Sequence, residues 1–290
     1  MVAVNQLHYM VLGVKDLAAW EEFATKGVGL VVSRRQGDTV HYRGDRDVAR
    51  IITVQSDHED VQAIGWSVSA EADLDELIAQ LVSEGIEYSD VRGQDARTRN
   101  AIRLVRIMFD GVVHEVAWGL AFEDRIPFQS PVAIEGFRLG ELGLGHIAML
   151  VSDMEQSDRF ITQILGHKVT GHMFVGPTEV RFYRCSARHH SIGIVQDPSP
   201  PRRVQHIQIE YNSMDDLGRA LDRAAQLPMP VIVPIGKHNA DWVISFYVRS
   251  PSGVAIELAH GGRLMREDEP TELEIFSGSV WGHRTGMDKL

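Results

Sequence analysis

The sequence predicts an α+β fold of two domains, each made of two paired βαβββ units that form an open barrel. Three observations lead to this expectation. Four stretches of the chain repeat one order of elements, in which a short apolar strand precedes an amphipathic helix and several further strands. The second and fourth stretches align without a gap over their first strand and helix. The chain has 290 residues, 44% of them hydrophobic, which is enough for two ordinary cores.

Short apolar strands open the four units. Their expected first residues are Leu7, Val61, Gly145 and Val204. A helix is expected after each strand, because apolar residues recur at the helical spacing i, i+3, i+4 and i+7, as they do between Leu74 and Leu81. The helix of the third unit is expected to begin after Asp153, which is a suitable N-cap, and to end near Leu165.

Turn sequences separate the later strands of the units. Asp110-Gly111 and Pro251-Ser252-Gly253 each lie between two runs of β-branched and aromatic residues, which favours a turn between strands. Residues 129–142 are richer in proline, glycine and polar side chains than their surroundings. We therefore expect two domains, residues 1–132 and residues 133–290.

Composition excludes several classes of protein. The formal net charge of −11 argues against a nucleic-acid or an anionic membrane partner, since both need a basic face. The one cysteine, Cys185, excludes an internal disulfide and a cysteine-rich zinc site. Met1 to Asp16 lack the pattern of a secretory signal, and no run of about 18 apolar residues could span a membrane. We therefore expect a cytoplasmic protein that binds neither nucleic acid nor membrane.

Three potential metal ligands fall at matching positions of the third and fourth units. His146 and His206 each stand on the first strand of a unit, and Glu257 stands near the end of the last strand. If the two units pair face to face, these side chains converge in one cavity. Two neutral imidazoles and one carboxylate form the facial triad of non-haem iron(II) oxygenases, which leaves positions on the ion for substrates. Each residue alone would more often be structural, so the prediction rests on their joint placement.

The N-terminal half offers an internal comparison. By the alignment of the repeats, His8 is expected at the position of His146 and Glu115 at the position of Glu257, whereas Ala63 replaces His206. Alanine has no lone pair to give to a metal. We therefore expect the N-terminal domain to hold no metal and to support the other half.

One long motif resembles a known family. The stretch from His238 through Phe246-Tyr247 and Pro251-Ser252-Gly253 to Glu257 resembles the signature of the type I extradiol dioxygenases in the vicinal oxygen chelate superfamily. Residues 143–146, Arg188-His189-His190-Ser191 and Trp281-Gly282-His283 extend the resemblance, which is greatest to the 2,3-dihydroxybiphenyl 1,2-dioxygenases. It implies the vicinal oxygen chelate, or glyoxalase-like, fold.

The resemblance implies an activity, a cofactor and site residues. The expected reaction is cleavage of a 2,3-dihydroxybiphenyl-like or other bicyclic or substituted catechol beside its hydroxyls, with O2, to a muconic semialdehyde-type product. The expected metal is Fe(II), with Mn(II) as the alternative, and the expected assembly is a homo-oligomer of two to eight chains. The residues carried over by position are His190 as acid/base, His238 and Tyr247 at the substrate oxygens, and Asp241 behind them. Phe182 and Phe174 are expected either to line the pocket, favouring a bulky aromatic substrate, or to pack in the core.

The sequence also departs from the family pattern. Ala240 stands where the family has an asparagine that shapes the pocket, so the exact catechol is not fixed by the resemblance. Two other readings share the fold: a glyoxalase-like, metal-dependent isomerase or lyase, and a non-enzymatic protein that binds small molecules. The first would not need His190, His238 and Tyr247 together, and proteins of the second kind lack the metal triad and are usually half this length.

Overall fold

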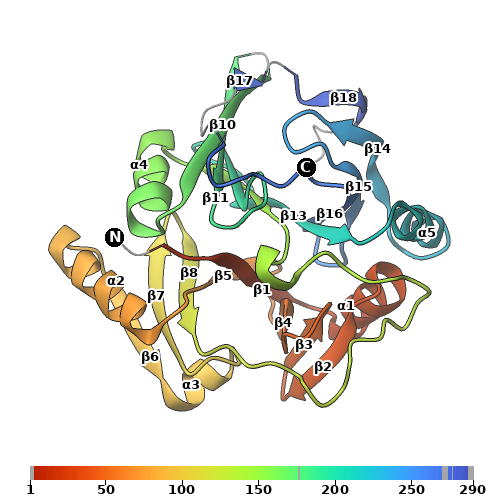
Figure 1. The fold of residues 1–290 in the computed structure, drawn as a ribbon. Coiled ribbons are helices and arrows are strands. Elements are labelled where there is room, and N and C mark those ends of the chain that lie inside the picture. The colour runs from red at the N-terminus through yellow and green to blue at the C-terminus, as the bar shows by residue number, and fades with distance from the viewer. Residues whose placement is uncertain (1–2, 176, 270–273, 276, 287–290) are drawn as a thin grey trace.

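Two mixed β-sheets, one in each half of the chain, form the framework of the protein (Figure 1). The computed structural model describes residues 3–175, 177–269, 274–275 and 277–286. The α+β architecture of paired βαβββ units predicted from the sequence is confirmed. No helix within these residues is long and apolar enough to cross a membrane.

The N-terminal half contains eight strands in the order β2-β3-β4-β1-β5-β8-β7-β6. The strands are β1 (Gln6–Val14), β2 (Val31–Gln36), β3 (Thr39–Arg43), β4 (Ile51–Gln55), β5 (Val61–Ser67), β6 (Tyr88–Arg92), β7 (Arg103–Phe109) and β8 (Val112–Trp118). The helices are α1 (Leu17–Glu22), which continues as the π-helical turn η1 (Phe23–Val28), α2 (Glu71–Glu84) and the short α3 (Gly93–Arg97).

The C-terminal half repeats this arrangement in a sheet of ten strands, ordered β17-β10-β11-β12-β9-β13-β16-β15-β14-β18. The strands are β9 (Ile147–Val151), β10 (Lys168–Val175), β11 (Thr178–Arg184), β12 (Ile192–Gln196), β13 (Val204–Tyr211), β14 (Val231–His238), β15 (Ile244–Arg249), β16 (Ala255–His260), β17 (Glu274–Ile275) and β18 (Ser279–Gly282). The helices are the 3₁₀ turn η2 (Gly140–Leu142), α4 (Met154–Arg159) with its π-helical extension η3 (Phe160–Ile164), and α5 (Met214–Ala224). The two additional strands, β17 and β18, come from the C-terminal tail.

Each sheet has an internal two-fold pattern. In the N-terminal half, β1 pairs antiparallel with β5, and each of these strands pairs parallel with the last strand of its own unit. In the C-terminal half, β9 and β13 pair in the same way, with β12 and β16 on their outer sides. This pattern brings the first and last strands of two units side by side, which is where the predicted ligands lie.

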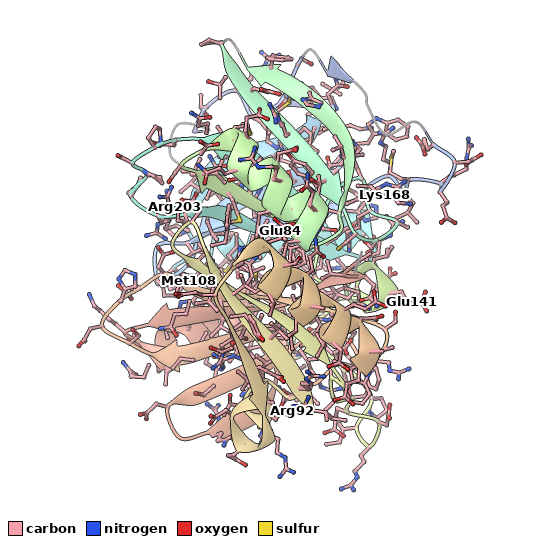
Figure 2. The ribbon with its side chains drawn as sticks, turned by 90° about the vertical axis from the view of Figure 1, so that its left-hand side faces the viewer. Glu84, Arg92, Met108, Glu141, Lys168 and Arg203 are labelled. Carbon is pink, nitrogen blue, oxygen red and sulfur yellow. The ribbon has the colours of Figure 1, made fainter. Side chains whose placement is uncertain are left out.

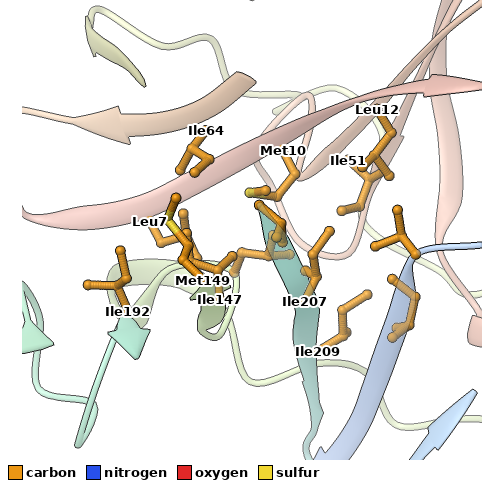
Figure 3. Packing of buried hydrophobic residues seen from close by; sticks show 14 of the residues in the cluster. Leu7, Met10, Leu12, Ile51, Ile64, Ile147, Met149, Ile192, Ile207 and Ile209 are labelled. Carbon is orange, nitrogen blue, oxygen red and sulfur yellow. The ribbon is translucent and has the colours of Figure 1, made fainter. Parts of the chain in front are cut away.

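A single apolar core joins the two sheets. Met10 and Ile51 from the N-terminal sheet belong to the same buried cluster as Ile147 and Ile207 from the C-terminal sheet (Figure 3). Because side chains alternate along a strand, the neighbouring residues point to the opposite face, toward the inside of each barrel. Each sheet therefore has one face committed to packing and one face free to line a cavity.

The helices brace the two halves against each other. Figure 2 shows α2, which ends at Glu84, beneath α4 on one side of the molecule. Gln80 donates a hydrogen bond of 2.8 Å to the carbonyl oxygen of Gln163 there. On the other side, the Arg223 guanidinium donates to the carbonyl oxygen of Gly27 at 2.9 Å. The halves are thus fixed relative to each other by polar contacts as well as by the core.

Two buried histidines lie in this shared core. The Trp66 indole N–H donates to Nδ1 of His114 at 3.1 Å, so that nitrogen must keep its lone pair. His167 lies against the edge of the Trp66 ring, with 4.8 Å between ring centroids. Burial lowers the pKa of each of the two imidazoles to about 3. Both histidines are therefore neutral in the folded protein.

We predict that acid weakens the fold through His114. At pH values between its unfolded pKa of about 6.5 and its lower folded pKa, His114 binds a proton only in the unfolded chain. The free energy of unfolding therefore decreases by about 1.4 kcal/mol for each unit by which the pH is lowered through this range. Urea unfolding at pH 7.5 and pH 5 should show a smaller loss of stability for His114→Gln than for wild type. The exposed His58→Gln serves as the control and should match wild type. Equal pH dependence of wild type and His114→Gln would contradict the prediction.

Candidate metal centre

Three donor atoms from separate strands meet inside the C-terminal barrel. Nε2 of His146 lies 3.1 Å from Nε2 of His206 and 3.1 Å from Oε2 of Glu257. Nε2 of His206 lies 3.5 Å from the same carboxylate oxygen. The three side chains are buried, and the Glu257 carboxylate has no exposed surface. The predicted convergence of these residues is therefore present in the structure.

The geometry and chemistry of the cluster fit a divalent metal ion. Nitrogen and oxygen donors bound at about 2.0–2.2 Å and roughly at right angles would lie about 3 Å apart, close to the separations found here. Burial lowers the pKa of His206 to about 3, which leaves its ring neutral and able to coordinate. Burial alone would raise the pKa of Glu257, but hydrogen bonding and attraction from His146 and His238 hold it well below its usual value. A buried carboxylate between two imidazoles calls for a cation.

Strand register explains why these residues meet. In the parallel β13–β16 pair, His206 lies opposite Ala255 and Gln208 lies opposite Glu257. His206 and Gln208 are two residues apart and so face the same side of the sheet. The Gln208 amide donates to Glu257 Oε2 at 3.3 Å and helps to orient it. Gln208 was not predicted from the sequence, although its place two residues after His206 gave the signal.

A glycine places the first ligand. Gly145, directly before His146, has φ of +144°. A Cβ atom there would lie 2.3 Å from the backbone oxygen of Gln208, which no side chain could tolerate. The close approach of the two backbones therefore requires glycine, and it brings His146 to the inner face of the barrel.

Two more predicted residues, His238 and Tyr247, border the cluster. The His238 and Tyr247 side chains are hydrogen-bonded, with 2.9 Å between Nε2 and the phenol oxygen. Nε2 of His238 also lies 3.4 Å from Oε1 of Glu257. Burial lowers the pKa of His238, but Glu257 and Asp241 outweigh it and raise that pKa to about 9. Burial and the Glu257 charge raise the pKa of Tyr247 well above its ordinary value, so the phenol keeps its proton.

His190 and Asp241 both lie next to the His146 ring, His190 on its face and Asp241 near its Nδ1. The His190 ring stacks on the His146 ring, with centroids 4.0 Å apart. Burial, reinforced by His146, lowers the pKa of His190 well below the usual range. Oδ2 of Asp241 lies 3.9 Å from Nδ1 of His146, on the side of that ring away from His206 and Glu257. Burial raises the pKa of Asp241.

Two histidines that received no role from the sequence support this group. Nδ1 of His189 lies 3.0 Å from Nδ1 of His190, within hydrogen-bonding distance. The His283 ring packs on His238 with 4.3 Å between centroids, and it is delivered by β18, which pairs with β14. The tail motif Trp281-Gly282-His283 was the only signal for His283, and the sequence could not show where the tail returns.

The two predicted phenylalanines are placed differently. Phe182 is buried and lies 4.7 Å from His190 between ring centroids. It forms a small apolar cluster with Ala240, Met173 and Val180. Phe174 is 42% exposed, and by alternation along β10 it points to the face opposite Met173. The structure therefore brings Phe182 to the site and does not bring Phe174 there.

The N-terminal barrel shows which of its residues match the metal ligands. Ala63 pairs with Val11, as His206 pairs with Ala148. His146 lies two residues before Ala148, and Tyr9 lies two residues before Val11. Tyr9, not His8, is therefore at the position of His146. The expectation for His8 is therefore wrong by one residue. The expectation for Ala63 is confirmed.

His8 has other partners. An irregularity in the pairing of β1 with β5 lies between Leu7 and Tyr9, and it shifts the alternation there. Nδ1 of His8 lies 3.4 Å from the Arg50 guanidinium, and its Nε2 lies 3.4 Å from Oδ1 of Asp47. The sequence does not reveal this bulge, because residues 9–12 are all apolar and show no alternation that a shift could interrupt.

The expectation that Glu115 matches Glu257 is confirmed. Glu115 lies opposite Gly65 on β5, as Glu257 lies opposite Gln208. Its carboxylate accepts hydrogen bonds from the Tyr9 phenol at 2.7 Å, from Arg99 at 2.9 Å and from Arg106 at 2.7 Å. Two arginine side chains thus supply the positive charge for this buried carboxylate.

Comparison with known proteins agrees with this geometry. Residues 143–258 match the Glyoxalase/Bleomycin resistance protein/Dioxygenase superfamily, and residues 7–55 match the first domain of dihydroxybiphenyl dioxygenase. The chain is 30% identical to an iron-dependent extradiol dioxygenase of Rhodococcus jostii, over 97% of both chains. It is 31% identical to a biphenyl-2,3-diol 1,2-dioxygenase of Metapseudomonas furukawaii, over 99% of this chain and 96% of the relative. A crystal structure of a halotolerant catechol dioxygenase matches with a TM-score of 0.92 at 29% identity, covering 98% of this chain and 95% of the other.

We predict that the two matching glutamates respond differently to the same substitution. Glu257→Gln removes an anionic ligand, so the protein should no longer retain a divalent metal after anaerobic loading and desalting. Glu115→Gln should retain the metal as wild type does but lose roughly 1–3 kcal/mol of stability, because two arginines lose their carboxylate. Metal analysis and urea unfolding of both variants measure these effects. Metal retention by Glu257→Gln equal to that of wild type would refute the assignment of the centre.

Proposed function

The chain belongs to the extradiol ring-cleavage dioxygenases, and we propose that its substrate is 2,3-dihydroxybiphenyl or a similar bicyclic catechol and its metal Fe(II). Enzymes of this kind cleave a catechol ring beside the hydroxyls and add both atoms of O2, giving a muconic semialdehyde-type product. The observation that carries the proposal is the buried cluster of His146, His206 and Glu257, with His190, His238 and Tyr247 around it.

The donor set supports iron. His146, His206 and Glu257 would hold Fe(II), and the ion would supply binding positions for a catechol and dioxygen and a route for charge between them. Mn(II) accepts the same donors and is the alternative. The name of the Rhodococcus jostii relative, an iron-dependent enzyme, favours iron.

His190 is proposed as the acid/base group. Because burial keeps its imidazole neutral, the ring can accept a proton from a catechol hydroxyl and return it later. Its ring lies on His146, so a substrate beside the metal ligands would be within its reach. The neighbouring His189 is within hydrogen-bonding distance of Nδ1 and fixes the orientation of the ring.

His238 and Tyr247 are proposed to hold the substrate oxygen. Nδ1 of His238 donates to the carbonyl oxygen of Gly278 at 3.1 Å, since a carbonyl can only accept. With the raised pKa of His238, its Nε2 carries a proton as well and donates to the Tyr247 oxygen. The phenol proton of Tyr247 is then available to a substrate oxygen. Asp241 supports the positive charge of His238 from behind.

The apolar residues beside the site are an argument for a catechol that carries an apolar substituent. Phe182, Ala240 and their neighbours form an apolar cluster beside His190. A second aromatic ring placed there would leave water for an apolar surface. The relative from Metapseudomonas furukawaii is named for a biphenyl diol, which agrees with a bicyclic substrate.

The proposal also covers the organisation of the protein. Residues 133–290 would carry the reaction, and residues 1–132 would support them without a metal, as the arginine-paired Glu115 suggests. A homo-oligomer of two to eight chains is supported by exposed apolar side chains such as Trp242 and Trp281. The single free thiol of Cys185 supports a reducing, cytoplasmic location.

We predict that the iron-loaded protein consumes oxygen with 2,3-dihydroxybiphenyl and forms a yellow product. Its kcat/KM should exceed that for unsubstituted catechol by roughly 10- to 100-fold, the effect expected from burying one more aromatic ring. Oxygen-electrode traces and absorbance after anaerobic iron loading measure both. An isomerase or a binding protein would consume no oxygen, and a preference for catechol would refute the bicyclic substrate alone.

We predict that His190→Asn lowers kcat by roughly 10²- to 10⁴-fold, the usual effect of losing an acid/base group. Metal content should stay unchanged, because His190 is not one of the three ligands. His172→Asn is the control: His172 contacts Glu179 on the outer face of the sheet, and its replacement should leave kcat unchanged. A kcat for His190→Asn within a few-fold of wild type would remove His190 from the mechanism.

A further inference from the structure

A cavity outside the metal centre lies between the C-terminal sheet and the start of the chain. Its volume is about 330 Å³, and none of the metal-binding residues lines it. Its polar and charged lining includes Lys168, Arg184 and, as the one acidic residue, Glu267. Its apolar lining includes Val4, Ala187 and Met265. The cavity thus combines an excess of positive charge with an apolar wall.

Arg184 is the unusual residue of this cavity. Only 6% of it is exposed, and its Nη2 donates to the carbonyl oxygen of Arg266 at 3.3 Å. Its Nε is buried and has no hydrogen-bond partner, and no carboxylate lies within ion-pair distance among the residues that the structure describes. A buried guanidinium without a counter-charge is costly.

The other buried arginines do not share this condition. Arg50, Arg103 and Arg188 each form an ion pair with a carboxylate. Arg43 donates to three backbone carbonyl groups. Arg184 is therefore the exception among the buried arginines of the described chain, and the fold itself does not explain it.

Lys168 adds a second positive charge on the same face. It lies directly opposite Arg184 in the antiparallel β10–β11 pair, and like charges in that relation repel. Its side chain is exposed on the C-terminal half, where Figure 2 labels it. No ion pair of Lys168 is found within the described part of the chain. An anion between the two cations would remove the repulsion and supply the counter-charge that Arg184 lacks in the described structure.

We propose that this cavity binds a small carboxylate with an apolar body. The Arg184 guanidinium, which lines the cavity, can donate to the oxygens of a carboxylate, and Lys168 adds a point charge. The apolar body would lie against Val4, Ala187 and Met265. The apolar wall favours a monoanion of this kind over a strongly hydrated phosphate. The proposal does not depend on ring cleavage.

The test uses benzoate as the probe and benzyl alcohol as its neutral counterpart. Isothermal titration calorimetry of the full-length, metal-loaded protein should show saturable binding of benzoate, weakened by sodium chloride, and no binding of benzyl alcohol. Arg184→Met should weaken benzoate binding at least about tenfold, the effect of one charge-assisted hydrogen bond. Lys168→Met should weaken it by roughly two- to fivefold, and the control Lys15→Met, an exposed lysine elsewhere, should leave it unchanged.

Thermal unfolding separates a binding role of Arg184 from a structural one. Without benzoate, Arg184→Met should unfold at the same temperature as wild type or higher, because it removes an uncompensated charge and keeps an apolar stem. Absence of saturable benzoate binding in wild type, or equal affinity in wild type and Arg184→Met, would overturn the proposal. If Arg184→Met does not fold, the exposed Lys168→Met decides, since unchanged affinity in that variant also overturns it.

Discussion

The register between neighbouring strands is the constraint on which the site depends. His206 and Gln208 face into the C-terminal barrel because they lie two residues apart on β13, and Glu257 joins them because β16 pairs with β13 without a shift. The residues between them, such as Ile207, face the core that joins the two halves. A slip of one residue would move every ligand into that core. Packing of the apolar face therefore holds the metal centre in position.

The two halves of the repeated fold each bury a carboxylate at the same position, but the two carboxylates have different partners. Oε2 of Glu257 lies beside the imidazoles of His146 and His206, where a metal ion would bind, and its Oε1 lies beside His238. Glu115, at the matching position, is balanced by Arg99 and Arg106. Both solutions satisfy the requirement that a buried charge be paired. Only the first leaves the carboxylate available to a metal ion, because two guanidinium groups already pair with the other.

Much of this organisation could be predicted from the sequence, and the failures have physical causes. The ligands His206 and Glu257 lie on regular strands, where the apolar pattern fixes the face, so the repeat predicted them. His8 was misplaced because a bulge shifts the register of β1. The π-helical turns η1 and η3, and the return of β18 that brings His283 to His238, depend on packing between distant segments. Short-range pattern carries no information about such contacts.

Most of the fully buried charged side chains in the C-terminal half lie beside a group of opposite charge. Glu210 is buried between Arg138 and Arg188, and Glu257 lies among histidines that can share a metal ion. Attraction from Arg188 and Arg138 overcomes burial and holds the pKa of Glu210 below its usual value. Arg184 alone in this group lacks a partner of opposite charge among the described residues. In the ranges that the structure describes, Arg43, which also has no ion pair, donates to three backbone carbonyl groups, whereas the buried Nε of Arg184 has no partner, so a ligand that arrives from solution better explains Arg184.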